Sequence, residues 1–276
     1  MHEVERHRII LAEVEEKPIA TLGYLVELLG ASEATVRRDI NELHQQRKLK
    51  KVRGGAEALH PPSNTALVGR PYSVNQTINA KAKREIARAA VGLLEDGMSV
   101  TISGGTTTFF MAEFMRLRKL HVLTNSFVMA EHLVKRSKCV VTLPGGSVYR
   151  EQNIILSPFP NDVSSRFYAS MLFIGAQGVG PQGVMEADPQ IVQAVMKLMD
   201  QADQRVLLVD SSKFQSRSNL IVCPLSRVDI VITDDGIDPK SQKMIEDAGC
   251  QLKIVSTKNA SNTIGNSTTE TSVHPD

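Results

Sequence analysis

Seven short apolar runs, separated by stretches of helical periodicity, occupy residues 80–255. They cover residues 98–102, 120–123, 139–143, 171–174, 205–209, 229–232 and 252–255. Amphipathic helices are expected between them, for example over 86–94 and 191–199. A strand that is buried on both faces is apolar throughout, whereas a half-buried strand alternates apolar and polar residues. The pattern therefore predicts an α/β domain over 80–255, with a mainly parallel sheet and helices on both faces.

Glycines and small polar residues follow the first of these strands. In open parallel sheets, ligands bind at the carboxyl ends of the strands, where the first turn of a helix offers free backbone N–H groups. Here Ser103-Gly104-Gly105-Thr106-Thr107 leads into a helix, and such a loop suits a phosphate group. In the alternative interpretation, the two glycines only allow the strand and the helix to pack closely.

Polar residues also follow other strands. Asn125 comes after the second, Gly145 and Gly146 after the third, and Lys213 after the fifth. A lysine supplies the positive point charge that an anionic ligand needs. Each position also has a simpler interpretation: a helix cap for Asn125, a turn for the glycines and a solvated side chain for Lys213. Together, these strand ends predict a site for a small anionic ligand.

The first 59 residues show a different pattern, with helices expected over 4–16, over 21–29 and from Ser32 onward. An apolar stripe at helical spacing consists of Leu22, Leu25, Val26 and Leu29. Gly30 follows in the usual helix-stop position, and serine is a favoured N-cap residue. The third helix is expected to bury Val36, Ile40 and Leu43. Helix, glycine turn and capped helix together predict a helix-turn-helix.

A basic strand pair, over 49–53 and 56–59, follows this helix-turn-helix and is typical of a wing. Gly54-Gly55 between the strands permits the positive φ of a tight turn. Residues 32–53 contain seven Lys or Arg against three Asp or Glu, a net charge of +4. We expect the third helix to enter the major groove of DNA and the wing to contact the backbone or the adjacent groove. The predicted DNA-binding residues are Ser32, Glu33, Thr35, Arg37, Arg38, Lys51 and Arg53. Two alternatives remain open: the module binds protein, or Arg38 pairs with Asp39 or Glu42.

The domain boundaries follow from changes in composition. Residues 1–59 form the predicted DNA-binding domain. Residues 60–79 contain Pro61-Pro62, Gly69 and Pro71 among mostly polar neighbours and are expected to be a linker. Residues 256–276 are rich in Ser, Thr and Asn and are expected to be a disordered tail.

Composition excludes several classes of protein. With 42% hydrophobic residues and a net charge of +2, the chain lies in the ordinary globular range. Its three cysteines, Cys139, Cys223 and Cys250, have neither disulfide-framework nor zinc spacing. No apolar run approaches the roughly 20 residues that cross a bilayer, and the N-terminus is not a secretory signal. We therefore expect a cytoplasmic protein with no metal, no cofactor and no membrane contact.

The motif Ser32-x-x-Thr35-x-Arg37-Arg38-Asp39, together with residues 51–56, resembles the DeoR family of bacterial transcriptional regulators. The resemblance spans roughly residues 4–255 and continues, in family order, through Lys83-x-x-Ile86-Ala87, Gly105-Thr106-Thr107, Thr124-Asn125, Gly145-Gly146, Gly175-Ala176 and Asp210-Ser211-Ser212-Lys213. It implies an N-terminal winged helix-turn-helix and a C-terminal effector domain related in fold to ribose-5-phosphate isomerase. It also implies a phosphorylated-sugar effector, double-stranded operator DNA, repression of a carbohydrate catabolic operon, and a homodimer or homotetramer.

The resemblance also extends to a subgroup and to an effector site. The wing over 49–53 and the segment 155–158 look most like the subgroup that regulates L-ascorbate utilisation, which implies L-ascorbate 6-phosphate as effector. The effector-binding residues are then Ser103, Gly104, Gly105, Thr106, Thr107, Asn125, Gly145, Gly146, Gln177 and Lys213.

Three positions depart from the resemblance. Arg47 stands where most of the family has glycine, and Ala20 takes the usual cap position of the second helix, so Thr21 is expected to cap it instead. Residues 175–180 resemble the isomerase segment that holds two catalytic aspartates, but Gln177 and Gly180 occupy those positions. Neither residue can abstract a proton from a sugar carbon. We therefore expect binding without turnover; the alternative function is a sugar-phosphate isomerase with an accessory N-terminal domain.

Overall fold

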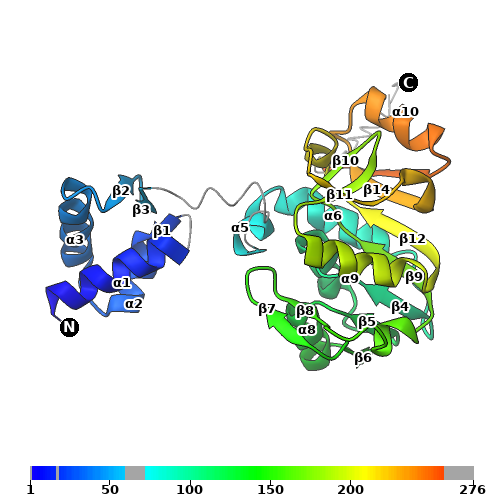
Figure 1. Ribbon diagram of the computed structural model, residues 1–276, viewed down its shortest axis with the longest axis horizontal. Helices are drawn as coiled ribbons and strands as arrows, with labels where there is room; N and C mark the ends of the chain where they lie inside the picture. The colour runs from blue at the N-terminus through cyan, green and yellow to red at the C-terminus, as the bar shows by residue number, and fades with distance from the viewer. Residues whose placement is uncertain (1, 17–18, 60–71, 258–276) are drawn as a thin grey trace, which may run out of the picture. The chain divides into compact units, whose positions relative to one another are not determined.

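The computed structural model describes residues 2–16, 19–59 and 72–257 (Figure 1). It divides into two compact units, Met1–Val68 and Gly69–Asp276. The segments 60–71 and 258–276, which hold most of the expected linker and most of the expected tail, lie outside the described residues.

The first unit is built from three helices and three short strands. These are α1 (Glu3–Glu16), β1 (Ile19–Thr21), α2 (Leu22–Leu29), α3 (Glu33–Gln45), β2 (Leu49–Val52) and β3 (Gly55–Ala58). The predicted caps are confirmed, because Thr21 Oγ1 accepts from Tyr24 N at 3.3 Å and Ser32 Oγ accepts from Thr35 N at 3.2 Å. Gly30 ends α2 in the left-handed region, at φ 56°. The winged helix-turn-helix is therefore present.

The wing is part of a three-stranded sheet of order β1-β3-β2. The sequence did not predict β1, since three residues are too few to show a period. The sheet closes over a core of helix residues that includes Ile10, Leu25, Val36, Ile40 and Leu43. Gly55 is required by this closure, because a Cβ at this position would lie 2.2 Å from the Ala20 carbonyl oxygen.

The second unit is organised around a seven-stranded sheet in which every neighbouring pair is parallel. Its strands are β4 (Ser99–Ile102), β5 (His121–Thr124), β6 (Val140–Thr142), β9 (Ala169–Ile174), β12 (Ala202–Leu208), β14 (Ile230–Asp234) and β15 (Gln251–Val255). All seven predicted strands are thus found, in one sheet. The strand order is β15-β14-β12-β9-β4-β5-β6. From β4 the chain adds β5 and β6 on one side, and then continues with β9, β12, β14 and β15 on the other side, so the strand order switches between β9 and β4. The loops after these two strands therefore diverge to opposite sides and leave a crevice.

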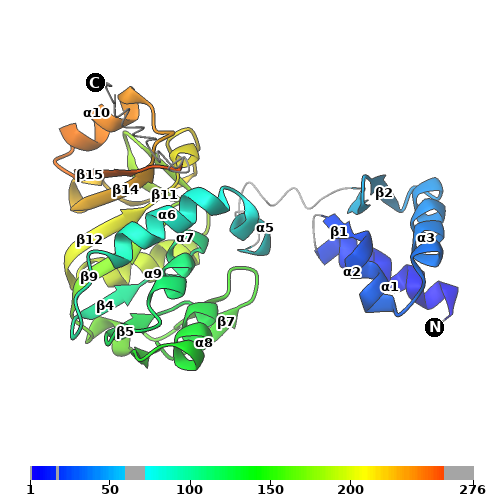
Figure 2. The ribbon, with the colours of Figure 1, turned by 180° about the vertical axis from the view of Figure 1, so that it is seen from behind.

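Helices cover both faces of the sheet, as predicted. They are α6 (Ala80–Val91), α7 (Thr106–Phe109), α8 (Phe127–Arg136), α9 (Pro189–Met199) and α10 (Pro239–Asp247). The ribbon of α9 lies in front of the sheet in Figure 1, and that of α6 in front of it in Figure 2. Adjacent strand residues divide between the two cores: Phe173 packs with Ile86 of α6, whereas Leu172 packs with Val195 of α9. Both faces being apolar explains why the strands have continuous apolar sequences.

Several elements were not predicted. They are α5 (Tyr72–Thr77), the hairpin of β7 (Ser147–Tyr149) and β8 (Ile154–Leu156), the antiparallel sheet of β10 (Gly178–Gly180), β11 (Gly183–Glu186) and β13 (Leu220–Cys223), and the 3-10 turns η1 (Phe110–Phe114), η2 (Val163–Ser165), η3 (Ser211–Phe214) and η4 (Leu225–Arg227). Residues 72–79 were assigned to the linker, but they belong to the second unit. This correction has a physical cause: six mostly polar residues carry no apolar stripe, and α5 is held instead by tertiary hydrogen bonds.

Across the part of the chain that the structure describes, no helix has both the length and the apolar character that crossing a bilayer requires.

Candidate functional site

The exposed start of α3 presents the predicted DNA-reading residues. Ser32 and Glu33 are exposed at its N-terminus, Thr35 is half-buried, and Arg37 and Arg38 project into solvent. The Arg37 guanidinium donates to Glu33 Oε1 from Nε at 2.8 Å and from Nη2 at 2.6 Å. Arg38 lies 3.9 Å from a carboxylate oxygen of Glu3 on α1. Exposed ion pairs of this kind contribute little to stability, so both arginines can exchange their partners for phosphates at small cost.

Asp39, the third residue of the Arg-Arg-Asp motif, points the other way. It is fully buried and accepts two hydrogen bonds from Arg6 of α1, from Nε at 2.7 Å and from Nη2 at 3.0 Å. Burial raises the pKa of the Asp39 carboxyl, but the hydrogen bonds and charge of Arg6 outweigh burial and hold this pKa below its usual value. The expected alternative, in which Arg38 pairs with Asp39, is therefore wrong. Asp39 fixes α3 to α1 and leaves both arginines outside.

The wing brings further positive charge to α3. Lys51 Nζ on β2 donates to Asn41 Oδ1 of α3 at 2.7 Å, which sets this exposed lysine beside the helix. Arg53 is exposed in the hairpin turn, next to Gly54, whose φ of 84° lies in the left-handed region. All seven predicted DNA-binding residues thus lie on α3, at its cap or in the wing.

The second unit has a small cavity, of about 70 Å³, at the crevice between β4 and β9. Seven of the ten predicted effector residues line it: Ser103, Gly104, Gly105, Thr106, Thr107, Gln177 and Lys213. The lining residues that the sequence did not predict are Tyr72, Asn75, Gln152, Ile154, Gly175, Ala176, Glu186, Ile191 and Val195. Most of these come from α5, the β7–β8 hairpin, β11 and α9, where no polar strand-end signal exists.

Hydrogen bonds and close packing fix the glycine loop after β4. Gly104 N donates to Asn125 Oδ1 at 2.7 Å, and the Thr108 hydroxyl donates to the carbonyls of Ser103 and Gly105 at 2.8 and 3.0 Å. A Cβ at Gly104 would lie 2.6 Å from Ile154 Cγ1, so the loop requires glycine there. The first turn of α7 leaves backbone N–H groups without helical partners.

Asn125 and the Gly145-Gly146 pair do not line this cavity. Asn125 supports the loop from behind and is not a helix cap, because Ser126 caps α8 by accepting from Met129 N at 3.3 Å. Gly145 and Gly146 are exposed beyond β6, the edge strand of the sheet. A Cβ at Gly146 would lie 2.2 Å from the Leu156 carbonyl oxygen, so this glycine is needed for packing on β8. Neither glycine lines this cavity, although the β7–β8 hairpin that follows them reaches it through Gln152 and Ile154.

Lys213 comes from η3, whose start is held by buried acids. Asp210 caps it and accepts from Asn79 Nδ2 at 2.8 Å, while Ser211 N and Oγ donate to Asp234 at 2.7 and 2.8 Å. The backbone N–H of Lys213 donates to the Asp210 carbonyl at 2.9 Å. This network explains the Asp-Ser-Ser-Lys sequence: the acid and serines anchor the turn, and the lysine side chain is left to line the cavity.

Glu186 supplies a carboxyl group among the lining residues that the sequence did not predict. Burial raises the pKa of its carboxyl to about 7, although the Ala187 N–H, which donates to Oε1 at 3.0 Å, and the positive charge of Lys213 act in the opposite direction. Turnover was not expected because positions 177 and 180 lack carboxylates, but this cavity has a carboxylate from another strand. A lone glutamate at the end of an apolar run gives no signal in the sequence.

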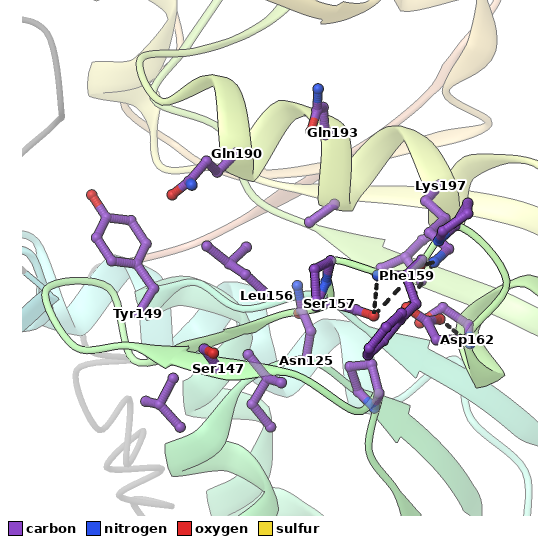
Figure 3. A pocket seen from close by; sticks show the side chains of 18 residues that line it. Asn125, Ser147, Tyr149, Leu156, Ser157, Phe159, Asp162, Gln190, Gln193 and Lys197 are labelled. Carbon is purple, nitrogen blue, oxygen red and sulfur yellow. Dashed lines mark hydrogen bonds and ion pairs between the residues drawn. The ribbon is translucent and has the colours of Figure 1, made fainter.

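A second, larger cavity, of about 660 Å³, lies between the β7–β8 hairpin and α9 (Figure 3). Asn125 borders it, together with Ser147 and Tyr149 of the hairpin. The two opposite charges among its described lining residues neutralise each other, since Lys197 Nζ donates to Asp162 Oδ2 at 2.7 Å. Those lining residues therefore do not supply the unpaired positive charge that an anionic ligand would need.

Comparison with known protein families agrees with this arrangement. A family model described as the DeoR-like helix-turn-helix domain matches residues 6–61, and one described as the DeoR C terminal sensor domain matches residues 78–235. The chain belongs to the DeoR family. As a DeoR-family protein it is a DNA-binding transcriptional regulator, with α3 and the wing in the helix-turn-helix match and the β4 and η3 loops in the sensor match.

Named relatives of this DeoR-family chain are regulators as well. The "HTH-type transcriptional regulator UlaR" proteins of Shigella dysenteriae serotype 1 (strain Sd197) and Escherichia coli (strain K12 / DH10B) are each 32% identical over 254 residues, which is 91% of this chain and 99% of the relative. Among solved structures, ribose 5-phosphate isomerase A from Methanocaldococcus jannaschii is 18% identical, over 49% of this chain and 54% of that chain, with a TM-score of 0.35. A likeness of that size supports no functional conclusion.

Proposed function

We propose that this DeoR-family regulator represses a carbohydrate catabolic operon and responds to a phosphorylated sugar such as L-ascorbate 6-phosphate. The observation that carries the proposal is the convergence of the β4 glycine loop, Gln177 and Lys213 on one cavity, in a chain that also has the exposed arginines of α3. The choice of sugar comes from the resemblance of the segments 49–53 and 155–158 to the subgroup that regulates L-ascorbate utilisation.

In the proposed complex, the phosphate binds the N–H groups of the first turn of α7 and the ammonium group of Lys213. The hydroxyl groups of the sugar then face Gln152, Gln177 and Glu186, whose amide and carboxyl oxygens accept hydrogen bonds. A buried site with several partly satisfied polar groups rejects ligands that lack matching hydroxyls, so it discriminates among sugars.

On the DNA side, α3 enters the major groove, while Lys51 and Arg53 contact the phosphate backbone. The proposed homodimer or homotetramer presents two such units to paired half-sites. The effector then changes their spacing, and a coupling of about 1–3 kcal/mol between the two sites is enough for control.

The test begins with thermal unfolding of the full chain in the presence of phosphorylated sugars, L-ascorbate 6-phosphate and ribose 5-phosphate among them. A ligand of the native state raises the unfolding midpoint. DNA sequences selected by the protein from a random pool are then used to measure DNA affinity with and without that ligand. A sugar that raises the midpoint and lowers DNA affinity at least tenfold supports the proposal. If no phosphorylated sugar has either effect, the proposal is wrong.

Glu186 favours a second candidate function, a sugar-phosphate isomerase with an accessory DNA-binding unit. A carboxyl with a pKa near 7 suits a general base at neutral pH. This candidate function predicts that the protein converts an aldose phosphate to its ketose, and that Glu186→Gln abolishes the conversion. If ribose 5-phosphate and other aldose phosphates bind but are not converted, the protein is not an isomerase.

A further inference from the structure

Tyr72, the first residue of α5, has a hydroxyl group without a visible role. The side chain is 7% exposed and lines the small cavity, yet its hydroxyl has no hydrogen-bond partner within residues 2–16, 19–59 and 72–257. A buried hydroxyl without a partner is costly, and such groups are rare in folded proteins. Burial also raises the pKa of the Tyr72 phenol above its usual value, so the group keeps its proton and remains a donor.

The Tyr72 ring lies against the last residue of α7. The ring packs edge-on against Phe109, the last residue of α7, with centroids 6.1 Å apart and planes at 78°. The α7 helix is the one whose first turn offers N–H groups to the cavity. Because Tyr72 lines the same cavity as the β4 loop, an oxygen of the ligand would satisfy its hydroxyl.

The cavity is too small for a sugar phosphate as it stands. Its volume of about 70 Å³ is well below the roughly 300 Å³ at the lower end of small-molecule pockets. A wall must therefore move when the ligand enters. Three walls are anchored in the core: the ends of β4 and β9 belong to the central sheet, and α9 buries Ile191 and Val195 against it.

Further walls come from the β7–β8 hairpin, β11, η3 and α5. Tyr72 N donates to the Glu151 carbonyl at 3.1 Å, and Lys83 Nζ of α6 donates to the carbonyls of Asn75 and Ile78. A six-residue helix outside the central sheet opens at a lower free-energy cost than a strand of that sheet. In the chain, α5 is also the first described element after the segment that leads from the DNA-binding unit.

We infer that Tyr72 is a ligand-binding residue and that its hydroxyl donates a hydrogen bond to the effector. This bond links the position of α5 to occupancy of the cavity, and α5 is connected in the chain to the segment that leads to the DNA-binding unit. This inference rests on the proposed function, because it requires a phosphorylated ligand in the cavity. In the absence of ligand α5 opens to admit it, and with ligand the bond to Tyr72 holds α5 closed.

The test compares the full-length protein with Tyr72→Phe, which removes the hydroxyl and keeps the ring against Phe109. Calorimetric titration uses L-ascorbate 6-phosphate and ribose 5-phosphate as probes. We expect about tenfold or greater weakening of affinity, since the variant cannot donate a hydrogen bond to a charged oxygen. Tyr168→Phe is the matched control, because the Tyr168 hydroxyl donates to Asp203 Oδ1 at 3.0 Å, outside the cavity. The affinity of this control variant for the ligand should stay within twofold of the wild-type value.

A second measurement tests the link to α5. Hydrogen exchange of the backbone amides of residues 72–77 should slow at least fivefold at saturating ligand in the wild-type protein, and much less in Tyr72→Phe at equal saturation. Unchanged exchange in the wild-type protein overturns the role of α5, and unchanged affinity of Tyr72→Phe overturns the role of the hydroxyl. If Lys213→Ala abolishes binding while Tyr72→Phe does not, only this inference fails. If no probe binds the wild-type protein, both this inference and the proposed function fail.

Discussion

The two sites of this protein handle charge in opposite ways. On α3, the Arg37 and Glu33 side chains are 62% and 60% exposed, and they form an ion pair that water screens. In the small cavity of the second unit, Lys213 and Glu186 are both half-buried, and burial moves the pKa of Glu186 to about 7. Exposed charges can exchange partners at small cost, whereas buried charges depend on the few groups around them. DNA binding should therefore respond to salt, and effector binding to pH and to single substitutions.

Asp39 is an exception in the first unit, because its charge is buried. Substituting it should give the largest effect of the substitutions that we propose. Asp39→Ala leaves the Arg6 guanidinium buried at the α1–α3 contact without its carboxylate, which is strongly destabilising. We expect the unfolding midpoint of this unit to fall by about 10 °C or more, with loss of DNA binding. Calorimetry of the full chain resolves this transition from that of the second unit, whose ligand binding should be intact.

Glu33→Ala is the matched control for Asp39→Ala, because it removes an exposed carboxylate of the same helix and should move the midpoint by less than about 3 °C. Acid adds an independent check. Since the pKa of Asp39 is lower in the folded protein, its contribution is present above the unfolded pKa, near 4, and is lost as the pH falls through the folded pKa. If Asp39→Ala and Glu33→Ala lowered the unfolding midpoint equally, Asp39 would not be the residue that holds α3 to α1.

Lys213→Ala should have the next largest effect. Removing the ammonium group from the proposed anion site should weaken binding of the phosphorylated sugar about 100-fold and abolish the ligand response of DNA binding. DNA affinity without ligand should be unchanged, as measured by fluorescence anisotropy. Equal loss of both activities would indicate a folding defect and not a ligand contact.

The sequence predicted the sheet well because its strands are buried on both faces, which gives continuous apolar runs that local patterns can reveal. The predicted runs and the observed strands agree to within a few residues, from β4 to β15. The strand-end rule then placed the β4 loop and Lys213 correctly in one cavity. It failed for Gly145 and Gly146, because the rule does not say which strands lie next to the crevice. Strand order is a tertiary property, and β6 is at the edge.

The remaining pocket residues could not be predicted for a different reason. Tyr72, Gln152 and Glu186 come from short elements whose positions depend on contacts distant in the sequence. Their burial, and with it their chemistry, arises only on folding. The same holds for Asp39, because its burial and its hydrogen bonds to Arg6 of α1 depend on how the two helices pack.

Arg37→Ala and Arg38→Ala should have intermediate effects, and they test the role of the exposed charges on α3. Each substitution should weaken operator binding up to about tenfold and reduce the slope of log affinity against log salt by about one for each phosphate that is no longer neutralised. Binding measured between about 50 and 200 mM salt gives both values. Lys135→Ala, which removes an exposed lysine of α8 in the other unit, is the control and should change neither. If affinity and slope are both unchanged in the arginine variants, α3 is not the DNA-reading helix.

Glu186→Gln should give the smallest effect, and it tests the role of the charges in the cavity. Its pKa is raised from a usual value of 4.5 to about 7, so the carboxyl is mostly protonated below pH 7 and charged above it. A charged carboxylate repels an anionic ligand, so affinity for the phosphorylated sugar should fall several-fold as the pH rises from about 6 to 8. Glu186→Gln keeps the size and removes the charge, so its affinity should lack this pH-dependent fall. The phosphate group of the ligand also titrates near pH 6, which favours binding as the pH rises, and this contribution acts equally on both proteins. The difference between the two pH profiles therefore isolates Glu186, and identical profiles would show that its carboxyl does not face the ligand.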